Sequence, residues 1–145
     1  MKLSELERAR AFLAKAAFHT PLAPSPHLGK LVGAEVWLKL ENLQRTGSFK
    51  IRGAYAKMAR LAAEKPGTAV VAASAGNHAQ GVAVSARMLG MQATIFMPKG
   101  VSLSKQQATE GAGAMVRLVG DSVEDGLEAA RAMVEAEFIH PFDDP

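Results

Sequence analysis

The chain has 145 residues, 48% of them hydrophobic and 21% charged, with a formal net charge of +3. These values are typical of a soluble globular protein with one sizeable core or two small ones. Lysine and arginine are scattered, aromatic residues make up only 6%, and cysteine is absent. The sequence therefore argues against nucleic-acid binding and excludes disulfides, thiolate metal sites and a cysteine nucleophile.

The first residues carry carboxylates, and no apolar core of a signal peptide follows them. No apolar stretch approaches the roughly 20 residues that a membrane-spanning helix needs. We therefore expect no membrane association and a cytoplasmic location.

Hydrophobic periodicity, capping signals and chain breakers predict the elements of the first part of the chain. Ser4 and Glu7 form a capping box that predicts the start of a helix. The predicted elements are, in order, a helix from Ser4 to Ala17, a loop from Pro21 to Gly29, a strand from Glu35 to Leu40 and a helix that opens at Lys50.

The breaker at residues 64–67 is a candidate hinge, and strands alternate with helices after it. We expect strands at 69–73, 93–97, 115–119 and 138–140, and helices at 77–89, 104–110 and 122–136. Residues 69–73 form a continuous apolar run, as in a strand buried on both faces. The alternation predicts an α/β fold with an open, mainly parallel twisted sheet and helices on both faces.

One segment, Thr46–Ala54, places a lysine directly after a small-residue turn, where apolar residues begin to recur at helical spacing. An amine held in a partly dry site loses proton affinity and becomes a nucleophile toward carbonyl groups. Simpler interpretations stay open. They are a solvent-exposed Lys50, Ser48 as a plain N-cap, Phe49 as a core residue and Arg52 in a surface or interdomain ion pair.

A second segment, Ala73–Gly81, follows the apolar strand 69–73. Ligands of open α/β sheets bind beyond the carboxyl ends of strands, and free N–H groups at a helix start suit an anion such as a carboxylate. Gly76 allows close backbone approach, and Asn77 offers a donor and an acceptor. The simpler interpretation is a tight turn in which Asn77 caps the helix.

Together these segments resemble the fold-type-II pyridoxal-phosphate enzymes, most closely their threonine deaminase and serine racemase branch. The similarity begins at Thr20-Pro21-Leu22 and continues through Trp37–Gln44, both segments and Gly111-Ala112 to the run from His140 to Asp143.

That resemblance implies roles for individual residues. It implies that Lys50 holds pyridoxal 5′-phosphate as a Schiff base, that Phe49 helps to position the ring, and that Asn77 hydrogen-bonds the phenolic oxygen of the cofactor. It also implies that backbone groups of the same loop hold the substrate α-carboxylate. This loop consists of Ser74, Ala75, Gly76, Asn77 and His78.

The reaction implied by the resemblance is deamination of L-threonine to 2-oxobutanoate and ammonia, and of L-serine to pyruvate. In serine racemase a serine precedes the Gly-Asn pair and protonates the second face of the substrate carbanion. Here that residue is Ala75, which has no proton to give. The sequence therefore favours elimination over racemisation.

The family chain is roughly twice as long, and its glycine-rich phosphate cup and the residue facing the pyridine nitrogen lie beyond residue 145. By the resemblance, residues 1–64 are the first part of the larger cofactor-binding domain and 65–145 are a small α/β domain. We expect uncovered apolar surface around Val36, Leu38 and Leu40, a homo-oligomer, and poor catalysis by this chain alone. The alternative is a non-catalytic α/β module that binds a carboxylate or a partner chain.

Overall fold

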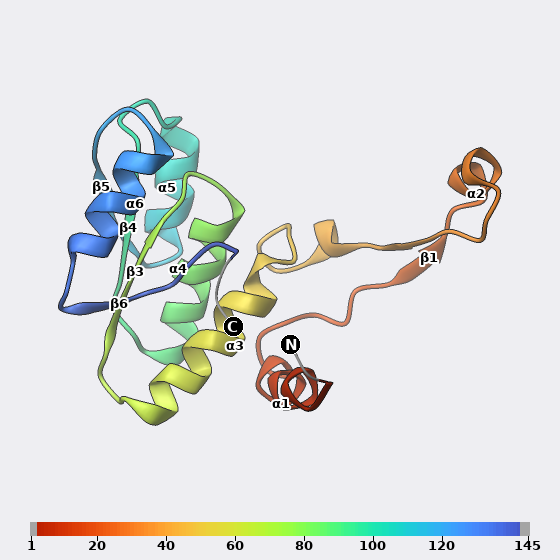
Figure 1. Cartoon of the computed structure of the whole chain (residues 1–145), viewed down its shortest axis with the longest axis horizontal. Helices are drawn as coiled ribbons and strands as arrows, with labels where there is room; N and C mark the ends of the chain where they lie inside the picture. Colours follow the sequence, from red (N-terminus) through yellow and green to blue (C-terminus); the bar gives the residue numbers. More distant parts are fainter. Residues whose placement is uncertain (1–2, 143–145) are drawn as a thin grey trace.

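The body of the protein is a four-stranded parallel sheet in the order β5-β4-β3-β6 (Figure 1). The computed structural model describes residues 3–142. The strands are β3 (Ala69–Ala73), β4 (Ala93–Met97), β5 (Met115–Leu118) and β6 (Ala136–Phe138). The helices of this part are α3 (Lys50–Glu64), α4 (Asn77–Leu89), α5 (Leu103–Gly111) and α6 (Val123–Ala132). The predicted α/β fold with an open parallel sheet is confirmed.

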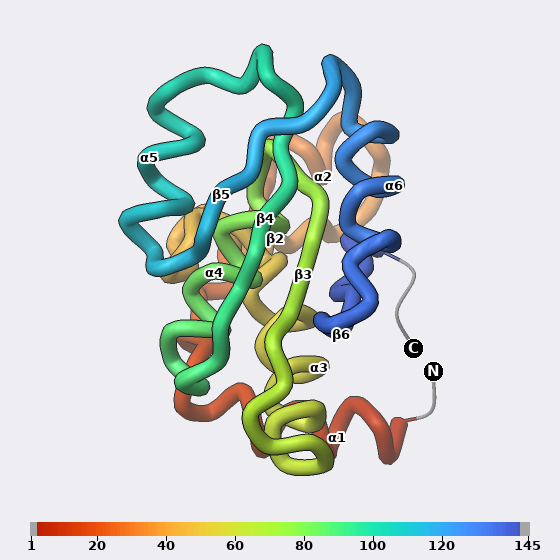
Figure 2. Tube along the Cα trace, turned by 90° about the vertical axis from the view of Figure 1, so that its left-hand side faces the viewer, coloured from red at the N-terminus to blue at the C-terminus, as the bar shows by residue number. Residues whose placement is uncertain are grey.

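Alternate residues of β3 enter two different cores, one on each face of the sheet. Val70 and Ala72 pack in a cluster with side chains of α3 and α4, whereas Val71 and Ala73 pack in a cluster with Ala130 of α6. Figure 2 shows α4 and α5 on one side of the strands and α6 on the other. Burial on both faces explains why this strand is a continuous apolar run.

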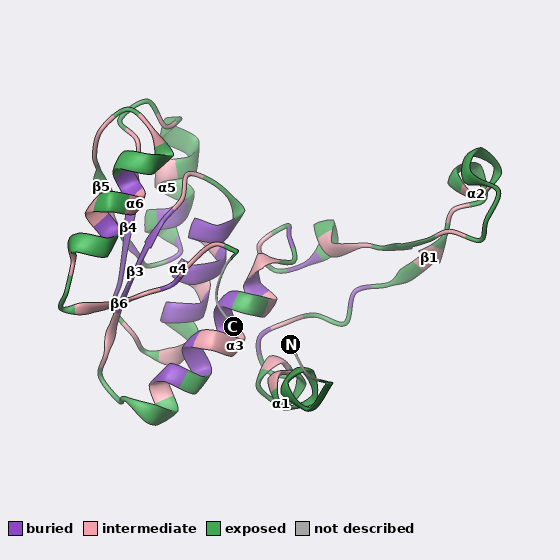
Figure 3. Cartoon of the chain, in the orientation of Figure 1, coloured by how far each residue is buried: buried purple, intermediate pink, exposed green. Residues whose placement is uncertain are grey.

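The N-terminal part contains α1 (Leu3–Leu13) and an arm that extends away from the body (Figure 1). The arm consists of β1 (Leu22–Pro24), α2 (Pro26–Val32) and β2 (Trp37–Lys39), and the short 3-10 helix η1 (Glu41–Leu43) follows it. The strands β1 and β2 pair antiparallel, and their residues are almost all exposed (Figure 3). Of the three residues expected to lie on uncovered apolar surface, Leu38 is exposed, whereas Val36 and Leu40 are half-buried.

The prediction of a loop from Pro21 to Gly29 is wrong, because this stretch holds β1 and most of α2. Pro26 occupies the first turn of α2, where a missing N–H costs nothing, and Gly33 ends the helix in the left-handed conformation at a φ of 67°. The prolines and glycines of this stretch therefore mark the two ends of a helix.

The ends of three other predicted elements are also corrected. Ser4 lies inside α1 and does not cap it, and the helix stops at Leu13 because the chain turns there to bury Ala16 against Ile51. The last helix ends at Ala132 instead of Ala136. The last strand is Ala136–Phe138 instead of 138–140, because its residues pair with Ala69–Val71 of β3.

Within residues 3–142, no helix is long and apolar enough to cross a membrane. Asp143, which closes the last stretch of the family resemblance, lies outside the described residues. The division into domains 1–64 and 65–145 stays a prediction.

Candidate functional site

The Lys50 amine is held at the carboxyl-end edge of the sheet. Phe49 is the N-cap residue of α3, so Lys50 is the first residue of the helix. Its Nζ donates a hydrogen bond of 2.6 Å to the carbonyl oxygen of Pro141, three residues after β6. The amine is therefore bound to a backbone carbonyl, and Lys50 is half-buried.

The two residues before Lys50 differ from their simpler interpretations. Phe49 is 59% exposed, so it is not a core residue, and its ring centroid lies 5.4 Å from Lys50 Nζ. Ser48 is 6% exposed and is not the N-cap. Among the described residues, its Oγ is the one buried side-chain polar atom without a hydrogen-bond partner. Because buried polar groups are nearly always paired, Ser48 Oγ marks a place where a further polar group fits.

The loop from Ser74 to His78 continues from the carboxyl end of β3. The Ser74 N–H donates to the Phe96 carbonyl of β4 at 3.1 Å, and the Ser74 Oγ accepts from the Gly76 N–H at 3.1 Å. These two bonds hold the loop against the sheet, ahead of the first turn of α4. N–H groups of a first helical turn have no partner within the helix, so they are available to an anion.

Asn77 is the first residue of α4, and Gly76 is the N-cap, so the interpretation of Asn77 as the cap is wrong. The side chain of Asn77 is exposed and makes no hydrogen bond to any residue in the range 3–142. A Cβ placed on Gly76 would meet no other atom of the described residues within 4 Å.

His78 contributes more than the backbone group that the sequence predicts. Its side chain is buried, and its Nε2 lies 3.0 Å from the carbonyl oxygen of Ile139. No local pattern indicates this contact, because the two residues are 61 positions apart.

Gly81 brings the two sequence segments together. A Cβ on Gly81 would lie 3.2 Å from the carbonyl carbon of Lys50 and 3.3 Å from the backbone nitrogen of Ile51. A side chain at this position would push the start of α3 away by a few tenths of an ångström, so glycine favours the close packing of α4 against α3. Gly81 is the last residue of the second segment, but the sequence predicted no role for it.

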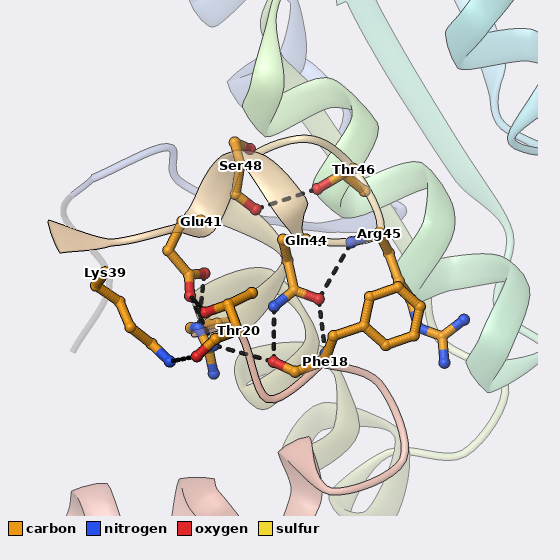
Figure 4. Close-up of polar contacts among 9 residues, drawn as sticks. Phe18, Thr20, Lys39, Glu41, Gln44, Arg45, Thr46 and Ser48 are labelled. Carbon is orange, nitrogen blue, oxygen red and sulfur yellow. Dashed lines mark hydrogen bonds and ion pairs between the residues drawn. The ribbon is translucent and has the colours of Figure 1, made fainter. Parts of the chain in front are cut away.

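A polar cluster fixes the chain on both sides of Lys50 (Figure 4). Arg52 donates from Nε and Nη2 to the two Glu41 carboxylate oxygens, both at 2.8 Å, and the Thr20 hydroxyl donates to the same carboxylate at 2.6 Å. The Arg52 guanidinium holds the pKa of Glu41 at about 2, below its usual value of 4.5. The ion-pair interpretation of Arg52 is thus correct, within this chain.

Gln44 and Arg45 fasten the same region to the segment after α1. Gln44 accepts from the Phe18 N–H at 2.7 Å and donates to the Phe18 carbonyl at 3.0 Å. Arg45 donates to the Ala16 carbonyl at 2.8 Å and lies over the Phe18 ring. The residues around Lys50 are therefore held by an ion pair and by hydrogen bonds between side chains and backbone groups.

A family model described as pyridoxal-phosphate dependent enzyme matches residues 13–145. The chain belongs to this family. It is 49% identical to the L-threonine ammonia-lyase of Thermotoga maritima over 146 residues, which cover 99% of this chain and 36% of that protein. The resemblance to the threonine deaminase and serine racemase branch is confirmed, and the cofactor of the family is pyridoxal 5′-phosphate.

Two solved structures show the same likeness. Threonine deaminase isoform 2 of Solanum lycopersicum has a TM-score of 0.88 and 36% identity, over 98% of this chain and 40% of that one. Maize serine racemase has a TM-score of 0.89 and 30% identity, over 99% of this chain and 44% of that one. The chain thus spans less than half the length of each of these relatives.

The residues present fit one side of the cofactor. The Lys50 amine is suited to the aldehyde carbon, the exposed Phe49 ring to the cofactor ring, and the exposed Asn77 amide to a phenolic oxygen. The Ser48 Oγ, which has no partner among residues 3–142, lies in the first of the same two segments. The positions of the phosphate cup and of the pyridine-nitrogen partner stay predictions.

Proposed function

We propose that this chain carries the lysine side of a pyridoxal-phosphate site that deaminates L-threonine to 2-oxobutanoate and ammonia, and L-serine to pyruvate. One observation carries the proposal most directly. A lysine amine is held by a backbone carbonyl at the carboxyl edge of a parallel sheet, next to a helix that packs against it through Gly81. The reaction is supported by the similarity to an L-threonine ammonia-lyase and to a threonine deaminase.

Residues of both segments would bind the cofactor or the substrate. Lys50 would hold the cofactor, which when bound withdraws electrons from the substrate Cα. The uncharged Lys50 Nζ accepts the proton from Cα. The first-turn N–H groups of α4, from Asn77 on, bind the substrate carboxylate, with the loop Ser74–Gly76 shaping the approach. Phe49 and the Asn77 side chain orient the cofactor ring.

Ala75 gives the proposal its stereochemical test. Its methyl group has no proton to donate, so the second face of the substrate carbon lacks an acid there. A chain extended to the length of its relatives should convert L-serine to pyruvate with little D-serine. Ala75→Ser should raise the D-serine fraction, with pyruvate and D-serine measured in the same reaction. Substantial D-serine from the unaltered protein would overturn this assignment.

We also propose that residues 1–145 alone are a poor catalyst and self-associate. The matched regions of the relatives make up only 36% to 44% of their lengths, and the arm of this chain is uncovered. The test compares 2-oxobutanoate release from L-threonine by residues 1–145 and by a chain extended to the length of the relatives. Equal turnover would contradict the proposal. Carboxylate binding without turnover by the extended chain would favour the non-catalytic module.

A further inference from the structure

The segment after β6 is anchored to the core through Ile139. Its N–H donates to the Val71 carbonyl of β3 at 2.8 Å, which extends the parallel pairing by one residue. Its side chain is buried in the core shared with α3 and α4. Its carbonyl oxygen lies 3.0 Å from His78 Nε2. Because a carbonyl oxygen only accepts hydrogen bonds, His78 Nε2 carries the hydrogen.

Two residues further on, the same segment holds the Lys50 amine. The carbonyl oxygen of Ile139 meets His78, and the carbonyl oxygen of Pro141 meets Lys50 Nζ at 2.6 Å. The segment 139–141 therefore links the start of α4 to the start of α3.

Alternate residues of this segment form a ladder of aromatic rings. The ring centroids of Phe138 and His140 are 5.6 Å apart, and those of His140 and Phe142 are 4.7 Å apart, both edge to face. His140 Nδ1 also accepts from the Phe142 N–H at 3.3 Å. These contacts shape the turn that carries the Pro141 carbonyl. The contact of Ile139 with His78 connects the segment to α4.

We propose that His78 is a positioning residue for Lys50. Its ring fixes the Ile139 carbonyl, and through it the Pro141 carbonyl that receives the lysine amine. Pro141 thus gives the amine a defined position whenever it is not covalently bonded. After Nζ has taken a proton, the ammonium group donates one of its three N–H bonds to this oxygen. The purpose of this arrangement rests on the proposed function, but the contact itself does not.

The test measures the reactivity of Lys50 without cofactor. The chain is treated with a limiting amount of an amine-reactive reagent, and labelling of Lys50 is compared by mass spectrometry with that of exposed Lys105. Breaking the link with His78→Leu should raise relative labelling of Lys50 by about 3- to 10-fold, the range expected when one hydrogen bond is lost. His78→Gln, which keeps an N–H near the position of Nε2, should restore the low value. His27→Leu, on exposed α2, is the matched control and should change nothing.

Unchanged Lys50 labelling in a folded His78→Leu variant would overturn the proposal, as would failure of His78→Gln to restore it. If both variants unfold, the proposal is tested on the unaltered chain. A ¹H–¹⁵N spectrum of its imidazoles must show His78 protonated at Nε2 at neutral pH, and an unprotonated Nε2 would overturn the proposal. A wild-type chain that passes these tests but forms no pyridoxal 5′-phosphate adduct on Lys50 would refute the proposed function alone.

Discussion

Glu41 accepts hydrogen bonds from Arg52 and Thr20 in the polar cluster around Lys50, and its negative charge should stabilise the fold. Its pKa in the folded protein, about 2, lies below its usual value of 4.5 because Arg52 binds the ionised form. The stabilisation is therefore present above the usual pKa and is lost as the pH falls toward 2. Glu41→Gln should lower the free energy of unfolding at neutral pH by about 1–3 kcal/mol.

The pH dependence separates this effect from a packing defect. In urea unfolding, the difference between Glu41→Gln and the unaltered chain should shrink from about pH 5 to about pH 2, because the Glu41 carboxylate becomes protonated. Glu128→Gln makes the same change on the exposed face of α6 and should have little effect at any pH. A difference of constant size across this range would contradict the account.

Single residues also show how far the sequence could predict the site. Lys50, Phe49 and the loop 74–78 stand in local patterns, so they could be named from the sequence. The hydrogen-bond partners of two of these side chains could not be predicted from the sequence. His78 meets a carbonyl 61 positions away, and Lys50 meets one 91 positions away. Only the folded topology brings such groups together.

At the scale of elements, the close packing of α3 and α4 decides where the two segments meet. Gly81→Ala would normally stabilise a helix by up to about 1 kcal/mol. Here the new Cβ would lie 3.2–3.3 Å from backbone atoms of Lys50 and Ile51, which cannot rotate away. We expect a net loss of about 1–2 kcal/mol in the free energy of unfolding, as in other overpacked cores.

The chain offers a matched control in Gly53, on the exposed face of α3. A Cβ there would meet no atom within 4 Å, so Gly53→Ala should stabilise the protein by up to about 1 kcal/mol. Thermal or urea unfolding of the two variants checks both signs. If Gly81→Ala stabilises the protein as much as Gly53→Ala does, the two helices are not in the close contact described.

The two central strands of the parallel sheet, β3 and β4, were predictable from the sequence because each is an almost continuous apolar run bounded by turns. The secondary structure of the arm was harder to predict, because prolines and glycines occur both in loops and at the ends of helices. Pro26 and Gly33 mark the two ends of α2. The last strand was displaced by two residues because its register depends on β3, 67 positions earlier in the chain at the pair Ala69–Ala136.

At the scale of the whole molecule, the arm is the part that lacks a packing partner. Leu31 and Val32 on α2 are 70% and 64% exposed. Clustered apolar surface of this kind favours association. We expect residues 1–145 to sediment as concentration-dependent oligomers, with the fluorescence of the single tryptophan, Trp37, moving to shorter wavelength as they form.

Substitutions on the arm and on the body distinguish association through the arm from non-specific association through any exposed apolar residue. The double variant Leu31→Glu and Val32→Glu should shift the chain toward monomer in sedimentation velocity. Val134→Glu changes a 91%-exposed apolar residue of the body and should leave the distribution as it was. A chain that stays monomeric at every concentration would contradict the prediction.

The central claim is that the Lys50 amine is the attachment point of the cofactor, and one measurement tests it most directly. The protein is mixed with pyridoxal 5′-phosphate, reduced with borohydride and digested, and the modified peptide is identified by mass spectrometry. The account predicts an adduct on Lys50, in the peptide that also contains Phe49, and its loss in Lys50→Ala. An adduct on Lys39 or Lys57 with Lys50 unmodified would contradict it.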